Sequence, residues 1–292
     1  MDGRCWFTRE ISRETGAPGI VISVLILTLN EEANLPDCLA SVQWSDDVLV
    51  LDAGSTDRTV EIAQKAGARV FVRAVTDERS QRAYSLTLPF KYPWVYNPDA
   101  DEITTPELRS EMQSVVASNP PEVAFRVRFK NYFQDRWIKH SSLYPTWVVR
   151  LFRPQNISFE RATNLRYIVK GREGRLNEHF LHYSFRRGIL PWIQKHTVYA
   201  DGEARESLNA NQAERGWLRL FSIDAVRRRS AWKRLSMRMP LRPVARFVYM
   251  YFLRMGFLDG RPGLIYCALL SFYEWMIVLR LHELKQQSAR RH

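Results

Sequence analysis

Short apolar runs alternate with amphipathic segments in the first third of the chain. Residues 20–29 read IVISVLILTL and are almost wholly apolar, which is typical of a strand buried on both faces of a parallel sheet. Leu35, Leu39 and Val42 follow at helical spacing, and we expect Asn30 to cap that helix. This rhythm predicts an α/β fold with a doubly wound, mostly parallel sheet.

The same patterns place the remaining elements. Thr105 and Pro106 combine a capping hydroxyl with a proline in the first turn, so we expect a helix to begin there. Gly67 is expected to end another helix, because glycine readily adopts the left-handed conformation behind a C-terminus. We expect strands at residues 48–51, 70–72, 94–96, 125–133 and 148–152, and a helix at 59–66.

Polar clusters follow three of the predicted strands, at residues 28–31, 52–57 and 99–101. Ligands of a doubly wound sheet bind beyond the carboxyl ends of its strands. We therefore expect these clusters, which are far apart in the sequence, to meet at one edge of the sheet and form the functional site.

Asp99 and Asp101 are the candidate metal ligands. Side chains two residues apart in extended backbone point the same way, and neighbouring carboxylates repel each other unless a cation compensates. Oxygen ligands of this kind suit Mg²⁺ or Mn²⁺, and such an ion can in turn hold a diphosphate. An isolated Asp-x-Asp is also a common polar loop, so the prediction depends on the two other clusters.

Further polar residues near these clusters have both a functional and a structural interpretation. Asp52 can accept a hydrogen bond from a nucleotide base, or it can simply form its turn with the glycine that follows. Glu31 can contact a ribose or a base, or it can complement the positive end of a helix. Arg82 and Arg150 can bind phosphate oxygens, or they can be solvated surface charges.

Several familiar sites find no support in the sequence. His179 and His182 are three residues apart, but no third metal ligand is evident, so we expect them to be structural. The widely spaced Cys5, Cys38 and Cys267 indicate neither a disulfide framework nor a zinc site, and they favour a reducing compartment. Phosphate-binding glycine loops and a G-x-S-x-G elbow are absent, which argues against dinucleotide redox, P-loop and α/β-hydrolase chemistry.

Composition adds a constraint on the partner. The chain has 292 residues, of which 46% are apolar and 25% are charged, so a wholly disordered or collagen-like protein is excluded. Lys and Arg number 43 against 31 Asp and Glu, which gives a net charge of +12. This excess indicates an anionic partner, either nucleic acid, a phosphorylated small molecule or acidic lipid.

Positive charge is concentrated toward the C-terminus. Residues 225–258 contain nine Lys or Arg and no Asp or Glu. The uncharged run that follows, Pro262–Tyr273, is 12 residues long, whereas a membrane span needs about 20. We therefore expect an interfacial or packed helix on an anionic membrane surface, and no nucleic acid partner. Its expected apolar stripe consists of Ile265, Leu269, Phe272, Met276 and Leu279.

Three sequence segments together resemble the family 2 glycosyltransferases. These segments read ISVLILTLNEEANLPDCLASV, VLVLDAGSTDRTVEIAQKAGARVF and NPDADEITTPEL. A narrower similarity, to bacterial lipopolysaccharide-core β-glucosyltransferases, continues through residues 137–140, 150–153, 181–184 and 257–260. The resemblance covers about residues 21–284.

This resemblance implies a GT-A fold, a nucleotide-sugar donor and inversion at the anomeric carbon. It assigns Thr28, Asn30 and Glu31 to the nucleotide pocket and Asp52 to the base. It also places Asp99 and Asp101 at the ribose, diphosphate and Mg²⁺ or Mn²⁺, with Asp101 favoured as a ligand. The predicted donor-binding residues are therefore Thr28, Asn30, Glu31, Asp52, Arg82, Asp99, Asp101 and Arg150.

The catalytic base is where the sequence departs from its relatives. Many of them carry a His-Glu or Glu-Asp pair after the strand at 150–153, whereas Asn164-Leu165 stands there in this chain. The nearest acidic candidate is Glu160, with Glu178 and Asp135 as alternatives. Ser141-Ser142 also replaces glycines that are frequent in relatives, which affects the expected acceptor site.

The predicted organisation is a polar extension at 1–19, a GT-A domain at 20–200 and a basic helical region at 201–292. We expect an inverting transfer of a sugar from a UDP-sugar to a lipid-linked or cell-envelope glycan, at the cytoplasmic face of the membrane. One alternative is a nucleotide-sugar-binding scaffold with little or no activity. Another is a nucleotidyltransferase, but the acidic segment at 30–32 stands where that class needs a basic glycine-rich loop.

Overall fold

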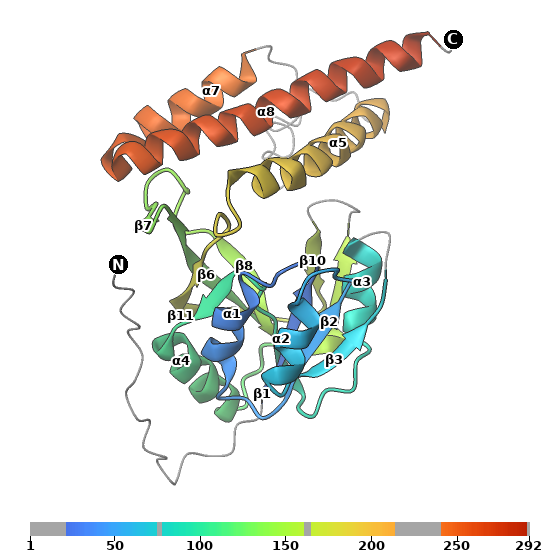
Figure 1. The fold of residues 1–292 in the computed structure, drawn as a ribbon, viewed down its shortest axis with the longest axis vertical. Coiled ribbons are helices and arrows are strands. Elements are labelled where there is room, and N and C mark those ends of the chain that lie inside the picture. The colour runs from blue at the N-terminus through green and yellow to red at the C-terminus, as the bar shows by residue number, and fades with distance from the viewer. Residues whose placement is uncertain (1–21, 75–77, 161–164, 214–240, 291–292) are drawn as a thin grey trace.

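The computed structural model describes residues 22–74, 78–160, 165–213 and 241–290, with backbone alone for 209–213. Figure 1 shows an α/β domain below and a layer of long helices above it. The predicted extension at 1–19, Asn164 and residues 225–240 of the basic run at 225–258 lie outside the described residues.

A nine-stranded sheet with the order β3-β2-β1-β4-β8-β6-β11-β5 forms the lower domain, and β7 pairs with β6. Its strands are β1 (Ile22–Thr28), β2 (Val48–Asp52), β3 (Arg69–Val72), β4 (Trp94–Tyr96), β5 (Glu102–Thr104), β6 (Ala124–Phe133), β7 (Arg136–Trp137), β8 (Trp147–Phe152) and β11 (Glu173–His182). The neighbours from β3 to β4 are parallel, as are β6 and β11, while β8 runs antiparallel to both of its neighbours. The predicted fold class is confirmed.

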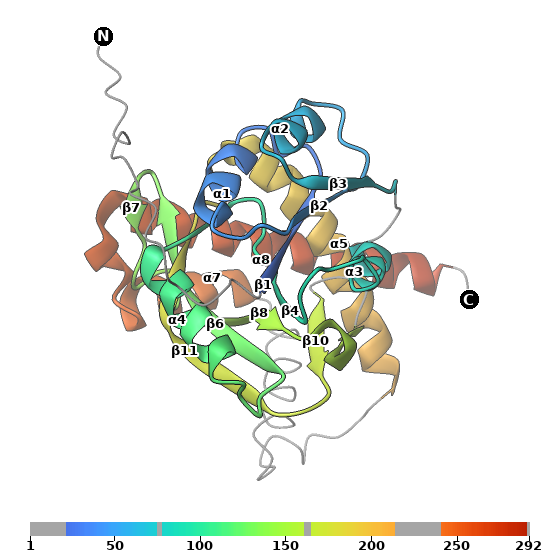
Figure 2. The ribbon, with the colours of Figure 1, turned by 90° about the horizontal axis from the view of Figure 1, so that it is seen from below.

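Helices cover both faces of the sheet, as a doubly wound fold requires. They are α1 (Leu35–Val42), α2 (Thr59–Lys65), α3 (Glu78–Ser85) and α4 (Pro106–Ala117). Figure 2 shows α1 and α4 on one side of β1 and β4, and α3 on the other side. The second face is also covered by a hairpin of β9 (Ile157–Glu160) and β10 (Arg166–Val169), next to a 3₁₀ turn at Pro154–Asn156.

The starts of two helices test the caps that the sequence predicts. The expected cap at Thr105 is confirmed, because its hydroxyl accepts a hydrogen bond from Leu108 N at 3.2 Å. The prediction that Asn30 caps the first helix is wrong, since α1 begins at Leu35 and Asn34 occupies the cap position. Asn30 adopts a left-handed conformation with φ of 55° in the preceding loop, where its side chain binds a different loop.

A layer of C-terminal helices lies above the carboxyl ends of the parallel strands (Figure 1). It consists of α5 (Ile189–Ala213), α7 (Arg242–Val248), a π-helical segment η3 (Tyr249–Leu253), a 3₁₀ turn η4 (Gly256–Asp259) and α8 (Gly260–Ala289). Helix α8 packs against both α5 and α7. Helix α5 runs through residue 200, at which the sequence placed a domain boundary, and the division into domains stays a prediction.

The apolar helix near the C-terminus is longer than its uncharged core suggested. Residues Gly256–Ala289 form a helical stretch that is long and apolar enough to cross a membrane by length and composition, which by itself is weak evidence for a span. The expectation that the run is too short is therefore wrong, because Glu274 does not end it. Glu274 pairs with Arg242 of α7 at 2.5 Å, so its charge is compensated within the layer.

Packing of α8 partly confirms the expected interfacial or packed helix. Tyr266, Cys267 and Ile277 are buried against the rest of the layer. The predicted apolar stripe divides between two environments, with Ile265, Leu269 and Met276 half-buried and Phe272 and Leu279 exposed.

Asp259 joins the helical layer to the sheet domain. Its buried carboxylate accepts hydrogen bonds from His140 N at 3.0 Å, from Ser141 N at 2.7 Å and from Ser141 Oγ at 2.7 Å. A side chain at Gly263 would come within 2.5 Å of Gly256 O, so the start of α8 requires glycine at this close approach. The contact between the two layers at this point therefore depends on one carboxylate and a tight turn.

We predict that Asp259→Ala destabilises the protein by about 3 kcal/mol, because three buried donors lose their acceptor. Urea unfolding of the purified chain measures this difference. Asp46→Ala is the matched control, since Asp46 forms an exposed ion pair with Lys91, and we expect a loss below about 1 kcal/mol. Equal losses in the two variants would contradict the role given to Asp259.

Candidate active site

Two of the three polar clusters are bonded directly to each other. Asn30 N donates to Ser55 Oγ at 2.7 Å, and Thr56 N donates to Asn30 Oδ1 at 2.8 Å. Glu31 N donates to Thr59 Oγ1 at 2.8 Å. The third cluster joins them through a parallel bridge between Leu27 and Asp99. The expected meeting of the three loops at the carboxyl edge of the sheet is found.

Asp52 is fully buried in the second loop, and its carboxylate is already occupied. It accepts hydrogen bonds from Thr28 Oγ1 at 2.9 Å, from Gly54 N at 2.9 Å and from Ser55 N at 2.7 Å. The Ser55 hydroxyl donates a further bond. These contacts correspond to the turn-forming interpretation of Asp52, and its contact with a base stays a prediction.

Asp99 lies between two guanidinium groups. Arg82 Nη2 of α3 is 3.2 Å from Asp99 Oδ1, and Arg150 of β8 contacts the other carboxylate oxygen. Burial disfavours the charged carboxylate, but Arg150 and Arg82 outweigh this effect and lower the pKa of Asp99. Both arginines therefore have a carboxylate partner and are not solvated surface charges.

Glu102 completes this buried charge cluster and was not anticipated from the sequence. Its Oε1 lies 2.5 Å from Arg150 Nη2, and its Oε2 accepts a hydrogen bond from Asp99 N at 3.0 Å. Burial raises the pKa of Glu102 to about 7, although the charge of Arg150 acts in the opposite direction. The only sequence signal was its position directly behind the Asp-x-Asp.

Asp101 faces His182 at the end of β11. The distance from His182 Nε2 to Asp101 Oδ2 is 3.3 Å, and Tyr183 N donates to the Asp101 carbonyl at 2.9 Å. Burial lowers the pKa of His182, but Asp101 and its hydrogen bond raise it by more. His179 and His182 lie on the same strand, where residues three apart point to opposite faces. His179 therefore does not face Asp101, and its ring lies beside Glu178.

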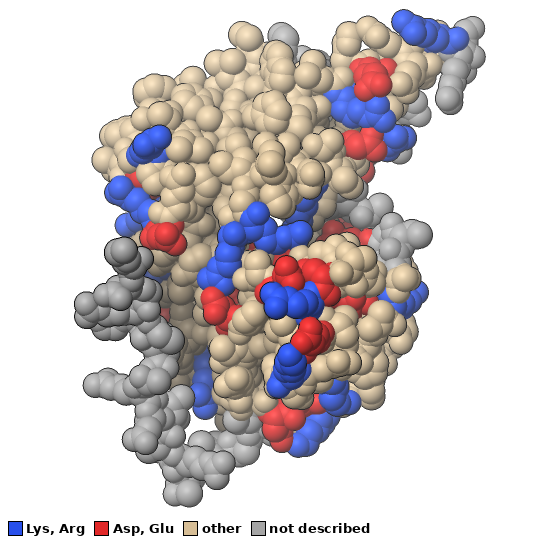
Figure 3. All heavy atoms as spheres, viewed as in Figure 1, with Lys and Arg blue, Asp and Glu red and all other residues tan. Residues whose placement is uncertain are grey.

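Charged side chains from several elements surround Asp99 and Asp101, and we call this group the charged site. It includes Glu31, whose carboxylate binds Asn34 Nδ2 at 2.7 Å and Arg187 Nη1 at 3.3 Å. Figure 3 shows acidic and basic side chains gathered where the helical layer meets the sheet domain. Arg187 lies two residues before α5, so the segment that leads into the helical layer contributes to the charged site.

Tyr167 connects the β9–β10 hairpin to the charged site. Its hydroxyl accepts a hydrogen bond from Arg82 Nη1 at 3.0 Å and donates to Asn97 Oδ1 at 3.0 Å. The hairpin therefore contacts one of the two arginines that hold Asp99.

The three candidate bases occupy different places. Glu160 ends β9 and lies 3.9 Å from Arg166, which precedes Tyr167 on β10. Glu178 lies in β11 next to His179, and Asp135 is in the turn between β6 and β7. Of these three, only Glu160 belongs to the hairpin that reaches Arg82, and the identity of the base stays a prediction.

Asp101 and His182 fit a divalent ion that is shared with a ligand. No group of three or more His, Cys, Asp or Glu side chains is arranged to hold an ion in the described part of the chain. Mg²⁺ in nucleotide sites commonly uses one or two protein ligands together with phosphates and water, and carboxylates with imidazole suit Mn²⁺. The buried Nδ1 of His182 has no hydrogen-bond partner among the described residues, while its ring packs edge-on against Phe129.

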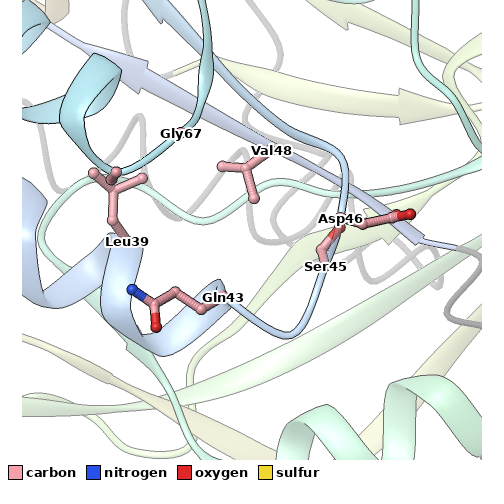
Figure 4. Close-up of a pocket in the computed structure, with 7 residues that line it drawn as sticks. Leu39, Gln43, Ser45, Asp46, Val48 and Gly67 are labelled. Carbon is pink, nitrogen blue, oxygen red and sulfur yellow. The ribbon is translucent and has the colours of Figure 1, made fainter.

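A separate pocket lies at the opposite edge of the sheet. Leu39, Gln43, Ser45, Asp46, Val48, Ala66 and Gly67 line it (Figure 4). Because Val48 is the first residue of β2, this pocket is at the amino end of the parallel strands and takes no part in the candidate site.

The chain belongs to glycosyl transferase family 2, because the model of that family matches residues 23–186, more than half of the sequence. It is therefore a transferase enzyme of the glycosyltransferase class.

Similar proteins agree with this assignment. An uncharacterized glycosyltransferase of Rickettsia bellii is 25% identical over 279 residues, covering 91% of this chain and 87% of that protein. The lipopolysaccharide core biosynthesis glycosyltransferase LpsC of Rhizobium meliloti is 28% identical over 179 residues, covering 60% and 58%. Among solved structures, glucosyl-3-phosphoglycerate synthase of Mycobacterium tuberculosis is 25% identical with a TM-score of 0.33, covering 40% of this chain and 45% of that one.

Proposed function

We propose that this glycosyltransferase moves a sugar, with inversion, from a UDP-sugar to a lipid-linked or cell-envelope glycan at the inner face of the membrane. The charged site around Asp99 and Asp101 is the observation on which the proposal rests, because its carboxylates and surrounding cations suit a metal-bound diphosphate. Similarity to LpsC, named for lipopolysaccharide core biosynthesis, supports the acceptor class.

The donor would lie across the carboxyl edge of the sheet. Thr28, Asn30, Glu31 and the turn of Asp52 would shape the nucleoside pocket. Asp101 and His182 would hold Mg²⁺ or Mn²⁺, which supplies electrostatic stabilisation of the diphosphate leaving group when it is bound.

Asp99 is assigned a more indirect part in the donor site. Arg82 and Arg150 keep its carboxylate ionised and fixed in orientation. We also propose that Asp99 acts as a second metal ligand and that Arg82 and Arg150 contact phosphate directly.

For the transfer step we assign the general base to Glu160. An acceptor oxygen would form the new bond to the anomeric carbon while the bond from that carbon to the diphosphate breaks. The acceptor proton would pass to the Glu160 carboxylate. Glu160 is chosen because it is the acidic residue nearest in sequence to Asn164-Leu165. Its side chain lies beside Arg166, on the other face of the hairpin from Tyr167.

UDP with Mn²⁺ should raise the unfolding temperature of the wild-type protein, because a ligand that binds only the native state stabilises it. At about 100 times the dissociation constant the gain is about 2.7 kcal/mol. Asp101→Ala should lose this stabilisation, whereas Asp46→Ala, at the opposite edge of the sheet, should retain it. Thermal unfolding followed by fluorescence measures the difference.

No stabilisation of the wild type by UDP, or equal stabilisation of Asp101→Ala, would contradict the proposed donor site. Stabilisation without turnover of a panel of UDP-sugars, with and without lipid acceptors, would favour the scaffold over the enzyme.

Glu160→Gln should lower kcat by about 100-fold and leave UDP binding unchanged, because the amide cannot accept the acceptor proton. Glu173→Gln, which removes a carboxylate paired with Arg126 on the sheet, is the matched control. Steady-state transfer assays should include Glu178→Gln and Asp135→Asn. A loss in one of these variants, with Glu160→Gln fully active, would move the base to that residue.

The proposed membrane contact rests on an apolar face of the helical layer. Its exposed members are Leu241, Val244, Val248, Phe252, Leu253, Leu264, Phe272, Trp275 and Leu279. Figure 3 shows that the side of this layer toward the viewer carries charged side chains only near its ends. Large exposed apolar surfaces mark interaction sites, and the basic composition of the tail favours anionic lipid as the partner.

Anionic vesicles should bind the protein, and added salt should weaken the binding, because charge attraction is screened within about 8–10 Å at ordinary ionic strength. Replacing Phe272 and Trp275 together by Asp should abolish binding in a flotation assay. Val72→Asp, an exposed apolar position on β3, is the control and should bind as the wild type does. Absent binding, or binding insensitive to both salt and the double replacement, would contradict the proposed contact.

A further inference from the structure

Lys195 differs from the other cations of the charged site. Arg82, Arg150, Arg187 and His182 each have a carboxylate oxygen within ion-pair distance. Lys195, by contrast, makes no ion pair within 4.0 Å among the residues that the structure describes. A cation left unpaired beside several carboxylates suggests that its partner is a ligand.

The chain passes the charged site on its way to Lys195. Strand β11 ends at His182, whose ring touches Asp101, and the backbone then reaches Arg187, whose guanidinium touches Glu31. Helix α5 begins two residues later, so Lys195 lies about 9 Å along its axis. Its ammonium group is 5.8 Å from the centre of the Tyr199 ring, one turn further on.

The ammonium group of Lys195 lies near enough to both aspartates to act on them electrostatically. The charge of Lys195 acts to lower the pKa of Asp99 and of Asp101. Burial lowers the pKa of Lys195 itself, but Tyr199 and Asp101 raise it by more, so the side chain stays protonated. Lys195 is nevertheless exposed to solvent, so a ligand can reach it.

We propose that Lys195 binds the diphosphate of the nucleotide donor and neutralises the negative charge that develops on it as the sugar leaves. This inference rests on the proposed function and deepens it, because it assigns a donor ligand to the helical layer. An ammonium group on a flexible stem suits a phosphate oxygen, and the rigid arginines below it are already held by Asp99. Helix α5 would then form part of the donor site.

Calorimetric titration with UDP in the presence of Mn²⁺ tests this assignment on the full chain. We expect Lys195→Gln to weaken UDP binding by about tenfold or more, the size of a lost charge-assisted hydrogen bond. Lys195→Arg should restore most of the affinity. Lys285→Gln, the same change at an exposed lysine of α8, should bind UDP as the wild type does.

Uridine, which has no phosphate, separates a ligand contact from a structural effect. Its binding, followed by saturation-transfer NMR, should be equal in the wild type and in Lys195→Gln. Equal affinity of both proteins for UDP would overturn the role of Lys195 while leaving the proposed function intact. Parallel loss of UDP and uridine binding, with a lower unfolding midpoint, would make Lys195 structural and would also overturn the inference. If the wild type does not bind UDP, the proposed function fails first.

Discussion

The buried contact of Arg150 with Asp99 and Glu102 is the interaction on which the site depends. Each of these charges would be costly to bury alone. The guanidinium of Arg150 compensates both carboxylates, whereas the two carboxylates repel each other. Arg150 comes from β8, which is the first antiparallel strand beside the parallel half of the sheet. The two carboxylates come from the segment between β4 and β5. The ion cluster therefore fixes the Asp-x-Asp loop at the seam between the parallel and antiparallel halves.

The loops around this seam are held in place because their polar groups form hydrogen bonds with one another. Asp52 holds its own turn through four donors, and Asn30 uses its backbone and side chain to bind that turn. Donor sites gain from such preorganisation, since the groups that meet the ligand need not reorganise when it binds. Asp101 and Lys195 are less constrained than these residues, which is consistent with their proposed contacts with the ion and the diphosphate.

Local signals in the sequence predicted much of the sheet domain. Residues 22–28 form a buried strand because their apolar run allows little else, and Thr105 caps α4 because hydroxyl and proline act within one turn. The failures involve partners far away in the chain. Asn30 has a side chain that can cap a helix, but it forms hydrogen bonds with residues about 25 positions later in the chain. His182 meets Asp101 only because β11 pairs with β5, a register that no local pattern specifies.

In the helical layer, a charged residue within an apolar run is part of a continuous helix. Glu274 breaks the apolar run in the sequence, yet Arg242 of α7 compensates its charge, so α8 continues as one helix. Asp259 ties the start of that helix to the loop at His140, and Arg187 ties the start of α5 to Glu31. These two attachments fix the starts of α5 and α8 relative to the sheet domain. The position of the helical layer therefore depends on two polar contacts that join residues more than 100 positions apart in the chain.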